Sequence, residues 1–74
     1  MDKPRKRSIT IAGHATSISL EAPFWDALKK IATHQKMSPQ DLIEEIDNAK
    51  RMASLSSAIR VYILSWYQDN TKDT

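Results

Sequence analysis

The 74-residue chain contains no cysteine and only one glycine. Without cysteine it has neither a disulfide framework nor a thiolate metal site, so packing or subunit association must stabilise it. No stretch approaches the roughly 20 apolar residues of a membrane span, and the first residues are polar where a secretory signal needs an apolar core. We therefore expect a cytoplasmic protein that makes no contact with a membrane.

A chain of 74 residues has room for one small domain. A domain of this size buries only about 60% of the surface that its unfolded chain exposes, so a second subunit would add stability. Neither an internal repeat nor a low-complexity segment is present. The sequence thus favours a single domain that associates with another copy of itself.

Positive charge is concentrated at the start of the chain. Residues 1–20 carry four basic side chains against one acidic side chain, whereas residues 21–74 carry seven against eight. The four basic residues are Lys3, Arg5, Lys6 and Arg7. We interpret residues 1–7 as a basic arm that contacts phosphate groups, or else as a tail that only aids solubility.

Residues 8–20 alternate apolar with hydroxyl side chains and are rich in β-branched residues, which is typical of strands. The apolar positions change parity midway, from the odd Ile9 and Ile11 to the even Ile18 and Leu20. In one continuous strand, these two pairs would point to opposite faces.

A hairpin with a two-residue turn at Gly13-His14 resolves this conflict, since glycine suits the first central position of a type II′ turn. The expected cross-strand pairs are Ile11 with Thr16 and Ile9 with Ile18. One face then becomes apolar. The other face carries the hydroxyl groups of Ser8, Thr10, Ser17 and Ser19.

A second interpretation of this segment remains open. Residues 15–21 would form the only strand, and residues 1–12 would form a mobile arm. The two interpretations differ in whether the chain forms a hairpin by itself.

Three later segments carry apolar residues at helical spacing. The first spans residues 22–34, and a break follows near Gln35 and Lys36. Ser38 is a suitable N-cap for a second helix, which we expect to start near residue 39 and to end near residue 53.

Ser54 or Ser56 would cap a third helix, whose apolar residues cover so much of its circumference that we expect a partner subunit to contact it. Arg60 stands on this helix and would pair with Glu44 or Asp47 of the partner, because an isolated buried charge is costly. Residues 69–74 are expected to fray.

The residue types that support catalysis or metal binding are not grouped in this sequence. His14 and His34 have no companion at ligand spacing, and no serine has a recognisable base or oxyanion site. We therefore expect no metal site, no cofactor and no enzymatic activity of its own.

The order of strand, helix, short connection and helix, with its apolar spacing from Thr16 to Ile46, resembles the ribbon-helix-helix proteins. A narrower resemblance, to small bacterial proteins of this fold, covers about residues 6–67. The segments that carry the narrower resemblance are Lys6-Arg7-Ser8-Ile9, residues 13–21, Phe24-Trp25 and residues 55–61.

The resemblance implies a mainly α fold with a short β segment, assembled as an intertwined homodimer. A strand or hairpin would precede two helices and a third, C-terminal helix, over residues 8–68. The strands of two chains would pair antiparallel around a shared core. The core residues would be Ile18, Leu20, Trp25, Leu28, Ile31, Ile46, Ile59 and Trp66.

In the family, the paired ribbon lies in the DNA major groove, whose width of about 12 Å admits two strands. Ser17 and Ser19 would face the bases, and the free amides that begin the second helix, near Ser38, would bind a phosphate. The basic residues on phosphate would be Arg5, Lys6 and Arg7.

We therefore expect a small dimeric protein that binds double-stranded DNA, a transcriptional regulator. The alternative is a dimeric protein-interaction module, antitoxin-like or an adaptor, that retains the fold without specific DNA binding.

Overall fold

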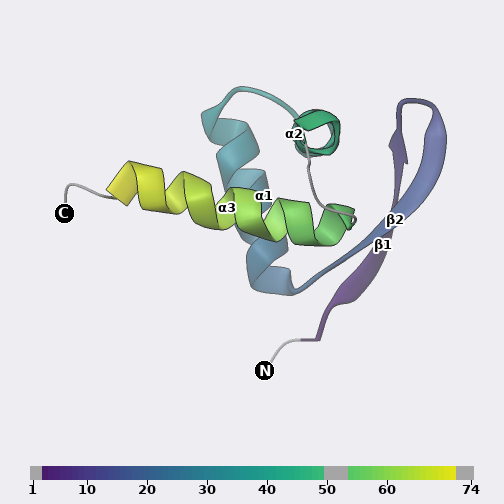
Figure 1. Cartoon of the computed structure of the whole chain (residues 1–74), viewed down its shortest axis with the longest axis horizontal. Helices are drawn as coiled ribbons and strands as arrows, with labels where there is room; N and C mark the ends of the chain where they lie inside the picture. Colours follow the sequence, from purple (N-terminus) through teal and green to yellow (C-terminus); the bar gives the residue numbers. More distant parts are fainter. Residues whose placement is uncertain (1–2, 50–53, 72–74) are drawn as a thin grey trace.

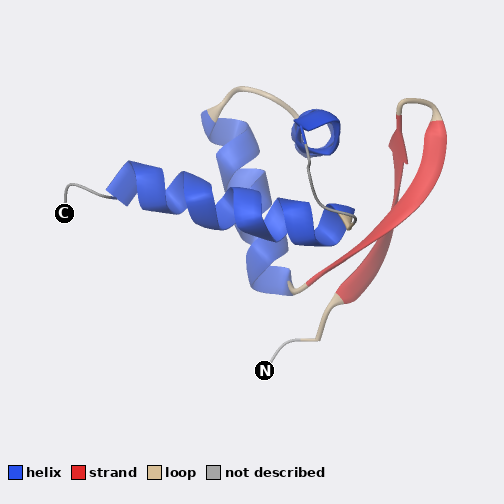
Figure 2. Ribbon diagram, viewed as in Figure 1, coloured by secondary structure: helices blue, strands red, loops and turns tan. Residues whose placement is uncertain are grey.

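The structure is a computed structural model that describes residues 3–49 and 54–71. Its elements are β1 (Arg5–Ile11), β2 (His14–Leu20), α1 (Ala22–His34), α2 (Pro39–Ala49) and α3 (Leu55–Thr71). Figure 1 shows the hairpin on one side of the helices, with α3 crossing α1 and α2 seen end-on. Both strands precede all three helices, as Figure 2 shows, so the expected mainly α fold with a short β segment is confirmed.

Strands β1 and β2 pair antiparallel, so the hairpin interpretation is confirmed and the single-strand alternative is wrong. The predicted position of the turn is also wrong, because the turn is Ala12-Gly13 rather than Gly13-His14. Both turn residues have positive φ angles, 50° at Ala12 and 81° at Gly13. This combination is the signature of a type I′ turn, whose twist matches that of the flanking strands.

The observed strand register differs from the expected one by two residues. Ile9 lies opposite Thr16, and Arg7 lies opposite Ile18. A shift by two preserves the parity of every position, so the two faces of the hairpin keep the expected residues. Ile11, Ile18 and Leu20 are buried against the helices. The opposite face, which we call the outer face, carries Lys6, Ser8, Thr10, Ala15, Ser17 and Ser19.

The boundaries of the hairpin and of the last helix also differ from expectation. β1 begins at Arg5, so residues 5–7 of the expected basic arm belong to a strand. Residues 69–71, which were expected to fray, are helical. The expected end of the second helix, near residue 53, lies outside the described residues, as do residues 72–74.

The helix boundaries follow the sequence signals. The Ser38 hydroxyl accepts a hydrogen bond from the Asp41 amide at 3.0 Å, and the Ser54 hydroxyl accepts one from the Ser57 amide at 3.3 Å. Both serines are therefore N-caps. After α1, Lys36 adopts a left-handed conformation with a φ of 61°, which ends the helix at the expected break.

The core of the described residues is entirely apolar. Its members are Ile11, Ile18, Leu20, Leu28, Ile31, Ala32, Leu42, Ile43, Ile46, Ala58, Ile59 and Ile63. Six of the residues expected in a shared dimer core are among them, and Trp25 and Trp66 pack against the same cluster while partly exposed. One chain already buries these six side chains by itself, so their contact with a partner subunit stays a prediction.

The turn generates a test, because Ala12 occupies a left-handed conformation that costs a non-glycine residue about 1–2 kcal/mol. Asparagine tolerates this conformation and is favoured before glycine in type I′ turns. We expect Ala12→Asn to raise the free energy of unfolding by about 0.5–1 kcal/mol, measured by urea titration. The control Ala15→Asn, within β2, should leave stability unchanged or lower it, because asparagine disfavours strands. Equal effects at both positions would contradict the assigned turn.

Candidate nucleic-acid interface

The outer face of the hairpin combines hydroxyl groups with positive charge. Lys6 lies directly opposite Ser19, and Ser8 lies directly opposite Ser17. All four side chains are exposed or half-exposed. Residues 3–20 carry four basic side chains and no acidic one, so this face presents hydrogen-bonding groups in a positive field.

The sequence predicts that Arg5, Lys6 and Arg7 contact phosphate together, but the structure places them on different faces of the hairpin. Only Lys6 shares the outer face with Ser17 and Ser19. Arg7 is on the inner face, where its guanidinium carbon lies 4.7 Å from the centroid of the Trp25 ring in a cation–π contact. Arg5 shares the parity of Arg7, and its side chain is exposed. Lys6 is therefore the basic residue that lies among the hydroxyl groups of the outer face, and Arg7 lies at the margin of this face.

Ser38 has a structural role at the start of α2. Its hydroxyl accepts the Asp41 amide, its carbonyl accepts the Leu42 amide at 3.0 Å, and Pro39 has no N–H. A phosphate at this helix end would compete with Ser38 for the Asp41 amide and would approach the Asp41 carboxylate. The phosphate contact expected here stays a prediction.

The end of β2 is attached to α3 through its outer backbone edge. The Ser19 amide donates to the Ser56 hydroxyl at 3.0 Å, and the Arg60 guanidinium donates to the Ser19 carbonyl at 3.0 Å. The same guanidinium donates twice to Glu21 Oε1, at 3.1 and 2.9 Å. We call these four residues the α3 clamp. It ties the strand to the last helix across about forty positions of sequence.

The predicted ion-pair partner of Arg60 is wrong. Arg60 pairs with Glu21 of its own chain rather than with Glu44 or Asp47 of a second subunit. The sequence does not indicate the α3 clamp, because no periodicity links residues 39 positions apart and Ser56 has a residue type that is typical of helix caps. The pKa of the Glu21 carboxyl lies below its ordinary value, first because the backbone amide of Glu21 donates a hydrogen bond to this carboxylate, and next because Arg60 donates to it.

A family comparison agrees with this arrangement of elements. The sequence pattern of the family described as the ribbon-helix-helix domain matches residues 4–67, which is more than half of the chain. The chain belongs to the ribbon-helix-helix family. Searches of curated proteins and of solved structures found no match. Ribbon-helix-helix domains are generally DNA-binding regulators or antitoxins and are typically non-enzymatic. No helix within the described ranges is long and apolar enough to cross a membrane.

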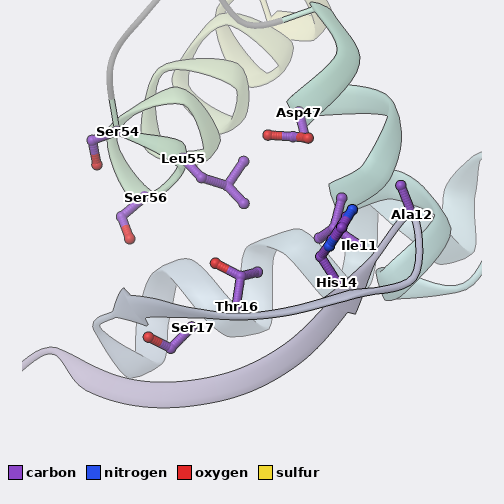
Figure 3. Close-up of a pocket in the computed structure, with 9 residues that line it drawn as sticks. All are labelled: Ile11, Ala12, His14, Thr16, Ser17, Asp47, Ser54, Leu55 and Ser56. Atoms are coloured by element: carbon purple, nitrogen blue, oxygen red, sulfur yellow. The ribbon is translucent and has the colours of Figure 1, made fainter.

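A hollow of about 430 Å³ lies between the hairpin of this ribbon-helix-helix domain and its last two helices. Its lining residues are Ile11, Ala12, His14, Thr16, Ser17, Asp47, Ser54, Leu55 and Ser56 (Figure 3). The hydroxyls of Ser54 and Ser56 each accept a backbone amide, as described above. These two serines therefore hold structural positions in the fold.

Helix α3 of the ribbon-helix-helix domain exposes apolar side chains on its far side. Val61 is 44% exposed, Leu64 is 57% exposed and Tyr67 is 37% exposed. Their spacing of three residues places them near one another along the helix surface. This group, which we call the α3 stripe, is the part of the described surface that fits the expected contact with another protein.

The clamp predicts a pH dependence of stability. The backbone amide of Glu21 and then Arg60 lower the pKa of the Glu21 carboxyl in the folded state. The ionised carboxylate therefore stabilises the fold above pH 4.5, the ordinary value, and this stability is lost as the pH falls through the folded pKa. We expect Glu21→Gln to lower the thermal midpoint at pH 7 and to have a smaller effect near pH 3, below the ordinary value of 4.5. The control Glu45→Gln, at an exposed position on α2, should show a smaller difference at both pH values. Equal losses from Glu21→Gln at pH 7 and pH 3 would contradict the assigned ion pair.

Proposed function

We propose that this chain is a small dimeric DNA-binding protein that acts as a transcriptional regulator in the cytoplasm. The supporting observation is the outer face of the hairpin, where Lys6 lies among four hydroxyl groups and where residues 3–20 carry no carboxylate. Duplex DNA presents a regular array of phosphates, which such a surface attracts at long range. The protein would need neither a cofactor nor catalysis for this role.

The chemistry of this face suggests how the DNA would be bound. Lys6 and the exposed Arg5 would contact phosphates, with Arg7 held beside Trp25 at the margin of the interface. Ser17 and Ser19 would meet base edges or sugars, where a hydroxyl hydrogen-bonds to several bases and discriminates weakly. Phosphate contacts should therefore supply most of the affinity.

The distribution of negative charge supports the same orientation. Helix α2 contacts β1 on the side of the core, away from the outer face. Its acidic side chains are Asp41, Glu44, Glu45 and Asp47. DNA that approaches the outer face would meet the cations of the hairpin before these carboxylates.

A second candidate function is favoured by the α3 stripe. Leu64 is the most exposed large apolar side chain of the described residues, and it is flanked by Val61 and Tyr67. A partner protein that covers this stripe would make the chain an antitoxin-like or adaptor module, with the fold retained and no specific DNA binding. A surface substitution such as Leu64→Asp would then abolish partner binding without unfolding the domain.

The leading proposal predicts a salt-dependent affinity for DNA. Each phosphate contact contributes about −0.9 to the slope of log K against log salt, so removal of Lys6 from both subunits should reduce the slope by up to about 1.8. We expect Lys6→Gln to weaken binding to all duplexes by a similar factor, because phosphate contacts carry no base identity. Fluorescence anisotropy between 50 and 200 mM salt, roughly the range over which such contacts dominate, measures this slope.

Lys30→Gln is the matched control, since Lys30 is an exposed lysine that belongs to α1 rather than to the hairpin. It removes the same charge and should leave the salt slope nearly unchanged. If full-length protein binds no duplex at low salt, the DNA proposal fails, and the interaction module becomes the better description.

A further inference from the structure

Two arginines stack on neighbouring aromatic residues at the start of α1. The guanidinium carbon of Arg7 lies 4.7 Å from the centroid of the Trp25 ring. The guanidinium carbon of Arg60 lies 5.7 Å from the centroid of the Phe24 ring. Both distances are within the roughly 6 Å range of cation–π contacts. Similar contacts thus hold one arginine of β1 and one arginine of α3 against the same helix.

The two guanidinium groups differ in what their N–H donors bind. Arg60 donates twice to Glu21 and once to the carbonyl of Ser19, so its donors serve the fold. Within the part of the chain that the structure describes, the guanidinium of Arg7 forms no hydrogen bond and no ion pair. A guanidinium that lies over a ring keeps its N–H groups in its own plane, where they can reach a further acceptor. The donors of Arg7 are therefore open to an external group.

The stack restricts the motion of Arg7 without covering it. Trp25 is partly buried and packs against the core, so the fold fixes the position of its ring. The side chain of Arg7 is exposed. Loss of rotamer freedom opposes binding when an arginine meets an acceptor. Contact with the Trp25 ring removes part of this freedom before any ligand arrives, which favours binding by preorganisation.

The charges around the stack favour an anion as the ligand. Residues 3–20 carry four basic side chains and no acidic one. Two carboxylates lie near Trp25 in the sequence, and each is paired with a cation. These ion pairs are Glu21 with Arg60 at 2.9 Å and Asp26 with Lys29 at 3.6 Å. A phosphate beside Arg7 would therefore meet a net positive charge.

We propose that Arg7 binds a phosphate of the DNA backbone through both arms of its guanidinium, and that Trp25 is the residue that positions it. The inference rests on the DNA binding of the proposed function and adds Trp25 to it. Arginine matches a phosphate through two parallel N–H···O bonds, a geometry that lysine lacks. Base edges form the floor of a groove and phosphates border it, so a cation at the margin of the outer face is placed for phosphate.

A double-mutant cycle on DNA affinity tests this role. Trp25→Leu keeps every charge and removes the ring. We expect it to weaken duplex binding roughly 5- to 30-fold, the equivalent of one exposed cation–π contact in each subunit of a dimer. In the Arg7→Gln background, the same substitution should have almost no further effect, because no cation remains to be positioned. Equal losses in both backgrounds would mean that Trp25 acts only through the fold, which would overturn the proposal.

The salt dependence of binding separates positioning from charge. Arg7→Gln removes one phosphate contact per subunit, so it should reduce the slope of log K against log salt by up to about 1.8. Trp25→Leu leaves the cation in place and should change this slope much less, although affinity falls. If Arg7→Gln leaves the slope of the unmodified protein unchanged, Arg7 contacts no phosphate and the proposal is wrong.

Phe24→Leu is the matched control, because it removes the neighbouring ring beside an arginine whose donors are already bound within the fold. It should weaken DNA binding much less than Trp25→Leu does. An equal loss would assign the effect to the packing of α1 and would overturn the proposal. Circular dichroism and urea titration check that each variant is folded. If Trp25→Leu does not fold, Trp25→Phe takes its place in the cycle, with a smaller expected loss because phenylalanine binds cations more weakly than tryptophan.

The affinity of the unmodified protein for duplex DNA separates the possible failures. If it binds no duplex at low salt, both the proposed function and the role of Trp25 are wrong. If it binds duplex DNA and the cycle shows no coupling between Arg7 and Trp25, only the role of Trp25 is wrong, and the DNA-binding proposal stands.

Discussion

The two-residue turn at Ala12-Gly13 is the constraint on which the rest of the structure depends. It reverses the chain at the point where the apolar positions change parity, so both strands direct their isoleucines to the helices. The same reversal directs Lys6 and the hydroxyl groups outward. A core of apolar side chains and a polar, basic face are thus two consequences of one turn.

The α3 clamp then converts the hairpin from a local element into part of the domain. Arg60 and Ser56 bind the backbone of Ser19, and Glu21 holds Arg60. The exposed fractions of the Glu21 and Arg60 side chains, 27% and 30%, mean that solvent screens this ion pair. Its main effect is therefore geometric, because it fixes the end of β2 against α3 and closes one of the two edges of the sheet.

The proposed function follows from a surface that the fold leaves open. The outer face of the hairpin has positive charge and hydroxyl groups without a carboxylate. This face belongs to the segment that precedes the first helix. In the dimer of the proposed function, two copies of this basic face would raise the positive charge that attracts DNA.

The sequence by itself determined the order of the elements, the helix caps at Ser38 and Ser54, and the residues of each hairpin face. These features depend on local spacing and parity, and an error of two residues in register leaves parity unchanged. Only the tertiary structure decided the turn at Ala12-Gly13, the position of Arg7 beside Trp25 and the pairing of Arg60 with Glu21. The last two depend on residues brought together from distant positions, and no short-range pattern records which charge meets which partner.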